Sequence, residues 1–227
     1  MLKLYTGNRN YSSWSLRGWL AVKLSGEPFE EVHVPLTGGS NPEWRAFSPS
    51  RRVPVLHDGG AVVWDSLAIA EYLAERHPGM WPQDRIARAW SRSACAEMHS
   101  GFTHLRNDMT MCIRERLDVR PWTDALRGDI ARVVELWTEG RERFGAGGAF
   151  LCGAFSLVDA FYAPVAFRFR TYEVSLSGVA AAYHAALLAH PFVAEWERAA
   201  LAETAIIEAD EPRVLYRDKL AAREGAI

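Results

Sequence analysis

The sequence predicts a protein of two parts, a small mixed α/β domain over residues 1–78 and an all-helical domain over residues 84–227. Strand-like alternation and a hairpin signal occur only before Pro82, and after it apolar residues recur at the three- and four-residue steps of amphipathic helices. Helices that follow a sheet, rather than alternate with its strands, favour two separate domains.

The first elements read as strand, helix and strand. Residues 2–6 alternate as a short strand, and leucines at four-residue spacing predict a helix from about Ser13 to Leu24 that Gly26 ends. Residues 29–34 form a second strand. Because a whole helix separates the two strands, we expect them to pair in parallel.

A hairpin and a helix complete the first part. A loop rich in Gly, Ser and Pro, with a short helix around residues 43–47, leads to the hairpin. The hairpin joins residues 53–56 to residues 61–64 through a turn at Asp58-Gly59-Gly60, and Asp65-Ser66 caps a helix from Leu67 to about Arg76. The predicted order is therefore β-α-β-loop-β-β-α.

The second part is predicted to be helical throughout. Apolar periodicity favours one long helix from Trp90 to Cys112 and another over residues 122–144. Ser156 and Asp159 form a capping box that opens a helix to about Tyr172, which Pro164 should bend. Two further helices are expected near residues 177–189 and 191–202, and the charged last dozen residues are expected to fray.

Composition excludes several classes of function. The 227 residues carry a net charge of −2 and no concentrated basic face, which argues against a nucleic-acid partner, and Arg51-Arg52 reads as a solvated loop. No apolar run reaches the ~20 residues of a membrane-spanning helix, and no signal peptide precedes the first strand. Three widely spaced cysteines with no C-x-x-C pair argue against a disulfide scaffold and against dithiol redox chemistry. We expect a cytoplasmic globular protein.

Four motifs stand in order along the chain: Tyr11-Ser12-Ser13-Trp14-Ser15-Leu16-Arg17, Arg52-Val53-Pro54-Val55-Leu56, Asp65-Ser66-Leu67-Ala68-Ile69-Ala70-Glu71-Tyr72-Leu73 and Phe155-Ser156-Leu157-Val158-Asp159. Together they resemble the cytosolic glutathione transferases, particularly the bacterial and zeta-like members that use a serine, over roughly residues 1–208. The resemblance implies a thioredoxin-like first domain, glutathione as co-substrate without a metal, and a homodimer that detoxifies small electrophiles.

Two residues depart from the zeta pattern. Trp14 stands where that pattern has a cysteine tied to the isomerisation of maleylacetoacetate, which argues against that activity and leaves serine-assisted thiol transfer. Asp65 stands where Glu or Gln is usual, which keeps an acidic acceptor but shortens its reach by one methylene.

The first motif carries the candidate thiol-activating hydroxyl. A free thiol with a pKa of ~8.5 is mostly protonated at neutral pH, and a hydroxyl at a helix N-terminus can donate to the thiolate while the helix dipole favours its charge. Ser12, Ser13 and Ser15 all qualify by position. The family pattern selects Ser12, with Ser13 as the alternative, and an ordinary N-cap serine is the structural reading of the same residues.

The second and third motifs carry the candidate glutathione-binding residues. The resemblance implies a cis bond between Val53 and Pro54, which turns the Val53 backbone outward to pair with the cysteinyl unit of glutathione; a trans proline at a strand end is the plain alternative. Ser66 and the helix N-terminus are expected to receive the γ-glutamyl carboxylate, and Asp65 the ammonium, in addition to capping the helix.

The electrophile pocket is predicted from the helical part. His99, Thr103, Arg106 and Asn107 share one polar stripe of the predicted long helix, which is otherwise the pattern of a solvated face. Alignment to the zeta pattern selects Thr103, Arg106 and Asn107, and Trp14 is assigned to the same pocket. Arg168 and Tyr172 on the bent helix are further candidates that we expect to approach the cleft. Cys95 and His99 lack a third ligand for a metal, so we expect no metal site.

Three classes of function follow. The leading hypothesis is an enzyme that adds glutathione thiolate to an electrophilic small molecule or catalyses a glutathione-dependent isomerisation. A non-catalytic binding module with the same fold is the second. A thiol-disulfide oxidoreductase is disfavoured, because the first helix contains no cysteine.

Overall fold

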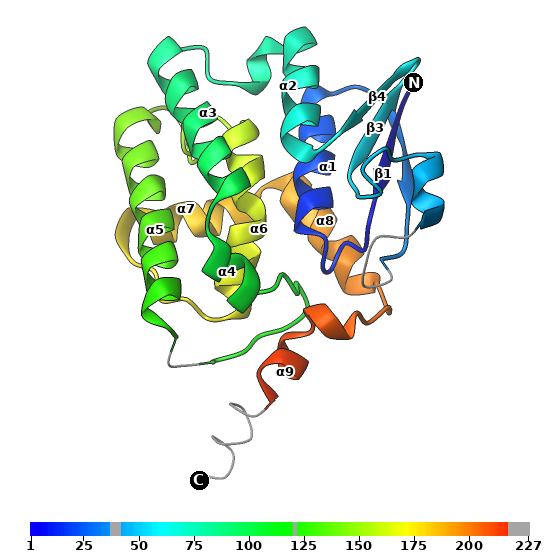
Figure 1. Ribbon diagram of the computed structural model, residues 1–227. Helices are drawn as coiled ribbons and strands as arrows, with labels where there is room; N and C mark the ends of the chain where they lie inside the picture. Colours follow the sequence, from blue (N-terminus) through cyan, green and yellow to red (C-terminus); the bar gives the residue numbers. More distant parts are fainter. Residues whose placement is uncertain (37–41, 120–121, 218–227) are drawn as a thin grey trace.

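Four short strands form one mixed sheet in the first part of the computed structural model, which describes residues 1–36, 42–119 and 122–217 (Figure 1). The first strand, β1 (Leu2–Thr6), pairs in parallel with β2 (Phe29–His33) and antiparallel with β3 (Val55–Asp58), and β3 forms the hairpin with β4 (Ala61–Trp64). The sheet order is β2-β1-β3-β4. The predicted thioredoxin-like mixture of parallel and antiparallel pairs is confirmed.

Two helices separate the sheet from the second part. The first, α1 (Ser13–Ser25), ends as predicted at Gly26, whose φ of 74° requires a residue without a Cβ and whose N–H donates to the carbonyl of Lys23. The second, α2 (Ser66–Arg76), follows β4 directly, and the short 3₁₀ helix η1 (Pro42–Ala46) lies in the loop before the hairpin. Both α1 and α2 stand beside the sheet, on the side of the remaining helices (Figure 1).

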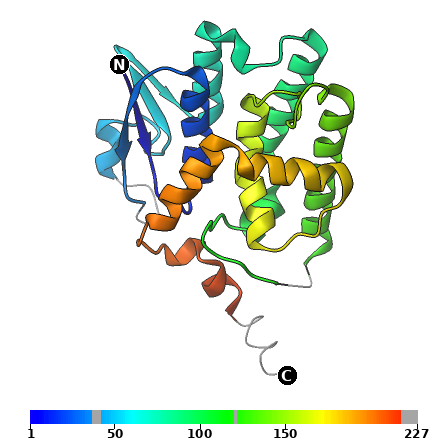
Figure 2. The same cartoon turned by 180° about the vertical axis from the view of Figure 1, so that it is seen from behind.

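The second part is helical, as predicted. Its helices are α3 (Arg85–Ser100), α4 (Thr103–Asp108), α5 (Asp124–Phe144), α6 (Leu157–Thr171), α7 (Gly178–Ala189), α8 (Pro191–Ala202) and the short α9 (Pro212–Leu215), with 3₁₀ turns η2 (Pro78–Met80) and η3 (Glu208–Asp210). Figure 2 shows α8 reaching from these helices to the side of the sheet. One hydrophobic cluster contains buried residues of the sheet, of α1 and α2, and of α3, α5, α6 and α7.

The prediction of one long helix from Trp90 to Cys112 is wrong. Helix α3 ends at Gly101, and Phe102 adopts a left-handed φ of 58° that turns the chain before α4 begins. The side chain of Arg106 then donates to the carbonyls of Met98, His99 and Gly101, which satisfies carbonyls exposed by the end of α3. A helix of 16 residues, α3, and a short one of 6 residues, α4, replace the continuous one.

Helix α6 is buried on almost every side and lies at the centre of the second part. The predicted capping box opens it: Asp159 is fully buried and its carboxylate accepts from the N–H of Ser156 (2.9 Å), the N–H of Leu151 (3.0 Å) and the hydroxyl of Tyr183 (3.0 Å). Burial raises the pKa of Asp159 to about 6.

The loop before α1 is held from the far end of the described chain. Glu203 accepts from the N–H groups of Arg9 (2.7 Å) and Asn10 (3.0 Å), and Tyr11 donates its hydroxyl to Glu211. Trp196 donates its indole N–H to the carbonyl of Arg9 at 2.9 Å. The segment from Glu203 to Glu211 therefore fixes the loop that leads into α1.

Three expectations concern the chain as a whole. The domain limits 1–78 and 84–227 stay a prediction, with η2 and the stretch up to Asp84 connecting α2 to α3. The fraying expected for the last dozen residues falls almost entirely outside the described residues. None of the helices in the described ranges has the length and apolarity that crossing a membrane requires.

Candidate functional site

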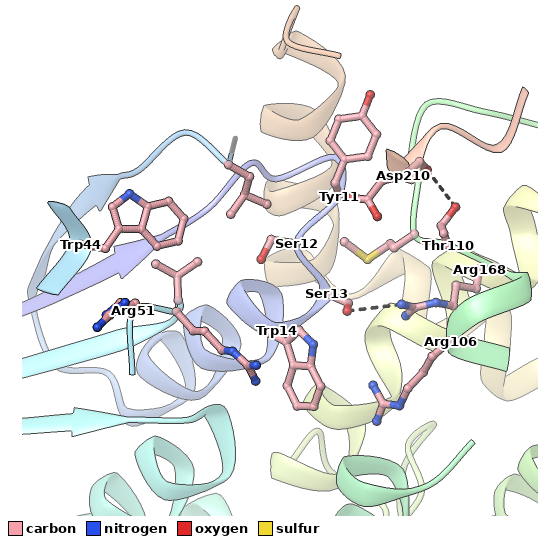
Figure 3. Close-up of a pocket in the computed structure, with 14 residues that line it drawn as sticks. Tyr11, Ser12, Ser13, Trp14, Trp44, Arg51, Arg106, Thr110, Arg168 and Asp210 are labelled. Atoms are coloured by element: carbon pink, nitrogen blue, oxygen red, sulfur yellow. Dashed lines mark hydrogen bonds between the residues drawn. The ribbon is translucent and has the colours of Figure 1, made fainter. Parts of the chain in front are cut away.

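A cavity of about 490 Å³ opens where the start of α1 faces the helical part (Figure 3). The loop and first turn of α1, the segment before β3, α4, α6 and η3 all contribute to its wall. The lining residues are Tyr11, Ser12, Ser13, Trp14, Leu36, Trp44, Arg51, Arg52, Val53, Arg106, Thr110, Met111, Arg168 and Asp210.

A second cavity of about 320 Å³ shares part of this wall and extends toward the start of α2. Trp14, Arg52 and Val53 line both cavities, and Ser50, Pro54, Trp64, Asp65 and Ser66 complete the second one. The three motifs of the first part, predicted to bind one tripeptide, therefore meet along one continuous wall.

The two candidate serines are buried and differ in their hydrogen bonds. Ser12 is the N-cap of α1: its oxygen accepts from the N–H of Ser15 (3.3 Å), and its hydroxyl donates to Ser15 Oγ (2.8 Å). Ser13 Oγ accepts from Nη2 of Arg168 at 3.3 Å, across the boundary between the two parts of the chain. In Figure 3 the two hydroxyls point in different directions, Ser13 toward Arg168.

The Val53–Pro54 bond is cis, as predicted from the resemblance. Val53 lines both cavities, and Pro54 is buried against α1, where its ring occupies the space that a Cβ on Gly18 would need. Gly18 therefore permits the close approach of α1 to this segment.

Asp65 and Ser66 are placed at the N-terminus of α2. Asp65 caps the helix by accepting from the N–H of Leu67 at 2.8 Å, and its other oxygen lies 3.4 Å from Nε2 of His99. Burial lowers the pKa of His99, an effect that the Asp65 carboxylate opposes. Ser66 is fully buried, and its hydroxyl has no hydrogen-bond partner among the described residues although it lines the second cavity. A buried polar group of this kind is unusual without a ligand.

Trp14 stands at the meeting point of the two cavities, between charged side chains. The guanidinium carbons of Arg17 and Arg106 lie 4.8 and 4.9 Å from its ring, and the ring of His99 meets it edge-on at 5.2 Å. Burial, reinforced by Arg106 and Arg168, lowers the pKa of the fully buried Arg17. Positive charge thus dominates the side of the cavity away from the sheet.

The structure brings only part of the predicted electrophile pocket together. Arg106 and Trp14 line the first cavity. Thr103 is exposed and does not line it, and Asn107 borders a separate cavity of about 260 Å³ near Trp122 and Tyr216. All three belong to α4, and of them only Arg106 lines the first cavity.

Several residues of the wall are not among the predicted site residues. Arg51 and Arg52 line it although the pair reads as a solvated loop in the sequence, and the available clue is that Arg52 opens the second motif, directly before Val53. Thr110 and Met111 come from an irregular segment and Asp210 from the short η3, and none of the three belongs to a motif. No group of three or more His, Cys, Asp or Glu side chains placed to hold a metal ion occurs within the described ranges.

Two family models match the chain. One, described as glutathione S-transferase, N-terminal domain, matches residues 11–76, and the other, described as glutathione S-transferase, C-terminal domain, matches residues 120–199. Together they cover more than half of the sequence.

Relatives in sequence carry names from the same group. The chain is 34% identical over 106 residues to a probable maleylacetoacetate isomerase of Caenorhabditis elegans (46% of this chain, 49% of the relative). It is 37% identical over 110 residues to a zeta-class glutathione S-transferase of Euphorbia esula (47% and 48%). Both matches span about half the length of the relative. A maleylacetoacetate isomerase of Pseudomonas aeruginosa matches at 28% identity over 211 residues (84% and 96%).

Solved structures share the fold. A glutathione transferase homolog from Burkholderia gl BGR1 with bound glutathione superimposes with a TM-score of 0.65 at 22% identity, over 89% of this chain and 98% of the other. A theta-class glutathione S-transferase from Xanthomonas axonopodis pv. citri, also with glutathione bound, gives a TM-score of 0.61 at 22% identity over 90% and 99%.

Proposed function

Because this chain belongs to the glutathione S-transferase family, we propose that it is an enzyme that binds glutathione, stabilises its thiolate and adds the sulfur to an electrophilic small molecule. The sulfur would lose its proton to solvent and form a bond to an electrophilic carbon. The electron pair displaced from that carbon would leave with a halide or, for an epoxide or enone, pass to oxygen.

The observation that carries this proposal is the unpartnered hydroxyl of Ser66. It is fully buried at the N-terminus of α2, where backbone N–H groups and the helix dipole favour an anion. The γ-glutamyl carboxylate of glutathione would supply the missing acceptor, and Asp65 would accept from the neighbouring ammonium. The backbone of Val53, a residue that lines both cavities, would pair with the cysteinyl unit, as strand addition at an open edge does.

The proposed roles divide between the two cavities. In the smaller one, Val53, Pro54, Asp65 and Ser66 bind glutathione. In the larger one, a hydroxyl of Ser12 or Ser13 donates to the sulfur, and Trp14 and Arg106 contact the electrophile. Thr103 and Asn107 would reach an electrophile only if it extended beyond this cavity.

A glutathione-dependent isomerase is the second candidate. The relative from Pseudomonas aeruginosa is named for that activity and matches along almost its whole length. Arg106 and Arg168 face the cavity and suit an acidic substrate, while Trp14 occupies the place of the zeta cysteine. An isomerase would add the sulfur and expel it again after bond rotation, so glutathione would not be consumed.

We further propose that the chain acts as a homodimer in the cytoplasm, as its family implies. The edge strand β4 exposes two large apolar residues, Val62 and Trp64, which a second copy of the chain would cover. Neither a nucleic acid nor a membrane is proposed as a partner.

Calorimetric titration with glutathione tests the binding step. We expect wild type to bind, Ser66→Ala to bind more weakly, and Ser93→Ala to bind like wild type, because Ser93 is an exposed serine of α3 that only contacts the carbonyl of Ala89. Turnover of chlorinated aromatics, epoxides, enones and an acidic cis-enone then separates the candidates. Absence of binding refutes the proposal, and binding without any turnover identifies a binding module.

A further inference from the structure

The two candidate serines are not equivalent, because the hydroxyl proton of Ser12 is already engaged in a hydrogen bond within the protein. Its hydroxyl donates to Ser15 Oγ at 2.8 Å, and that oxygen also accepts from the N–H of Gly7 at 2.9 Å. The Ser12 oxygen in turn accepts from the N–H of Ser15. These bonds close the first turn of α1 onto the loop after β1, so a donation from Ser12 to a sulfur would break a bond that holds the turn.

Ser13 has the opposite arrangement. Its oxygen accepts a hydrogen bond from Arg168, and among the described residues nothing accepts the proton of its hydroxyl. Ser13 lines the larger cavity and is 5% exposed. Its hydroxyl is therefore free to donate into that cavity, and the bond from a cationic donor polarises it toward doing so.

Arg168 is fixed in this position and keeps its charge. It is 4% exposed, donates through Nε to the carbonyl of Met109 at 2.7 Å, and forms no ion pair with any residue that the structure describes. Burial, with a further contribution from Arg106, lowers its pKa to about 10, so it remains protonated at neutral pH.

The charges that face Arg168 leave the cavity positive. Arg17 on α1 and Arg106 on α4 repel its guanidinium, whereas Tyr172 at the C-cap of α6 is neutral at pH 7. Asp210 on η3 is the acidic group that acts on it, and burial raises the pKa of that carboxyl. An anion placed beside Ser13 would thus be attracted by the positive charges of Arg17, Arg106 and Arg168, and of these facing groups only Asp210 would repel it.

We propose that Ser13, rather than Ser12, is the hydroxyl that donates to the sulfur of glutathione, and that Arg168 is a positioning residue that orients Ser13 Oγ and favours the thiolate by its charge. The inference rests on the proposed function and specifies how that site activates its thiol. No protein bond breaks: the thiol proton passes to solvent, and the Ser13 proton forms the hydrogen bond to sulfur.

The test measures the pKa of the thiol of bound glutathione, by recording the absorbance of the thiolate across pH. It compares wild type with four variants: Ser12→Ala, Ser13→Ala, Arg168→Met and Arg168→Lys. We expect Ser13→Ala and Arg168→Met each to raise this pKa by about one unit or more, a tenfold loss of thiolate at a fixed pH. Ser12→Ala should raise it by less, and Arg168→Lys should restore part of the shift, because lysine keeps the charge but lacks the planar fork.

Two controls separate this role from a structural one. Binding of S-methylglutathione, which has no ionisable thiol, should stay within about threefold of wild type in Arg168→Met, since one pKa unit corresponds to tenfold. Arg170→Met changes an arginine two positions away that pairs with Glu197 and does not line the cavity, and it should leave the thiol pKa unchanged.

The outcomes are distinguishable. If wild type binds neither glutathione nor S-methylglutathione, the proposed function fails and this inference with it. If wild type lowers the thiol pKa but Ser12→Ala alone raises it, the serine assignment is overturned. The role of Arg168 is overturned by either of two results. In the first, Arg168→Met leaves the pKa of the bound thiol unchanged, as Arg170→Met should; in the second, it lowers the affinity for S-methylglutathione by as large a factor as it lowers the thiolate fraction. In both cases Arg168 is only a structural residue.

Discussion

At the scale of single residues, Asp65 combines a strained backbone with two contacts. Its φ of 78° and ψ of 135° lie where residues other than glycine are seldom found, at a cost of about 1–3 kcal/mol. One oxygen caps α2 and the other faces His99. Strain of this kind persists where the surrounding structure requires it, which is consistent with a binding role for this carboxylate.

Two substitutions separate the charge of Asp65 from its capping role. We expect Asp65→Asn and Asp65→Ala each to weaken glutathione binding about tenfold or more, since a hydrogen bond to a charged group contributes about 1.5–3 kcal/mol. Asp65→Ala should also lower the free energy of unfolding by about 1 kcal/mol, because it removes the cap, whereas Asp65→Asn keeps an acceptor. Calorimetry and urea unfolding measure the two effects, and unchanged affinity in Asp65→Asn would show that the charge is not used.

At the scale of secondary structure, the start of α6 depends on the protonation of Asp159. Its folded pKa of about 6 lies above the ordinary value of 3.8. A raised acid pKa means that the folded protein holds the proton more tightly, so this contribution to stability is complete below pH ~4 and is lost as pH rises through about 6.

Comparison with Asp159→Asn isolates this contribution. Between pH ~4 and pH ~7, the free energy of unfolding of wild type should fall by about 3 kcal/mol relative to that of the variant, from a pKa difference of roughly two units at 1.36 kcal/mol each. Urea unfolding of both proteins across this range is the measurement. A difference that does not change with pH would mean that the carboxyl has the same pKa in the folded and unfolded chains.

The error at α3 shows what helical periodicity measures. Phe102, Leu105, Met109 and Cys112 are all buried, so the apolar spacing is real. It continues past Gly101 because those side chains still face the core, although the backbone has turned at Phe102. Burial and helical continuity coincide in α1, α5 and α8, where the predicted limits agree with the structure within a few residues.

The residues of the candidate site likewise fall into two groups, those that a local sequence motif predicts and those that depend on packing between distant segments. The positions of Ser12, Val53, Asp65 and Ser66 could be predicted, because each belongs to a short motif next to a strand or helix end. The contact between Ser13 and Arg168 joins residues 155 positions apart, and no local pattern encodes which face of α6 meets the start of α1. Only the packing of the two parts determines that contact.

At the scale of the whole molecule, α1 links the two parts of the chain. Lys23 pairs with Glu195 of α8 at 2.9 Å, and the rings of Trp19 and Trp196 meet at 5.4 Å. The N-terminal end of the same helix carries Ser13, whose oxygen accepts from α6. Because both parts contribute to its wall, the larger cavity forms only when α1 packs against the helical part.

The proposed homodimer predicts a specific effect at the sheet edge. Wild type should sediment at micromolar concentration with twice the mass of the chain, and Val62→Glu, which places a charge on an exposed apolar position of β4, should shift it toward monomer. Val62 lines neither cavity at the candidate site, so the variant should retain glutathione binding as a monomer. A wild-type monomer under these conditions would contradict the prediction.

The hydrogen bonds from the backbone N–H groups of Arg9 and Asn10 to Glu203 also determine when, during synthesis of the chain, the loop before α1 can be fixed. All four strands are present once Trp64 has been synthesised, but the carboxylate that fixes the loop before Ser12 follows Arg9 by 194 positions. At ~5–20 residues per second, that interval is roughly 10–40 s of translation. A nascent chain can thus pair its strands early, yet the loop before Ser12 gains this contact only after α8 has been added, and a chain broken off before Glu203 lacks it.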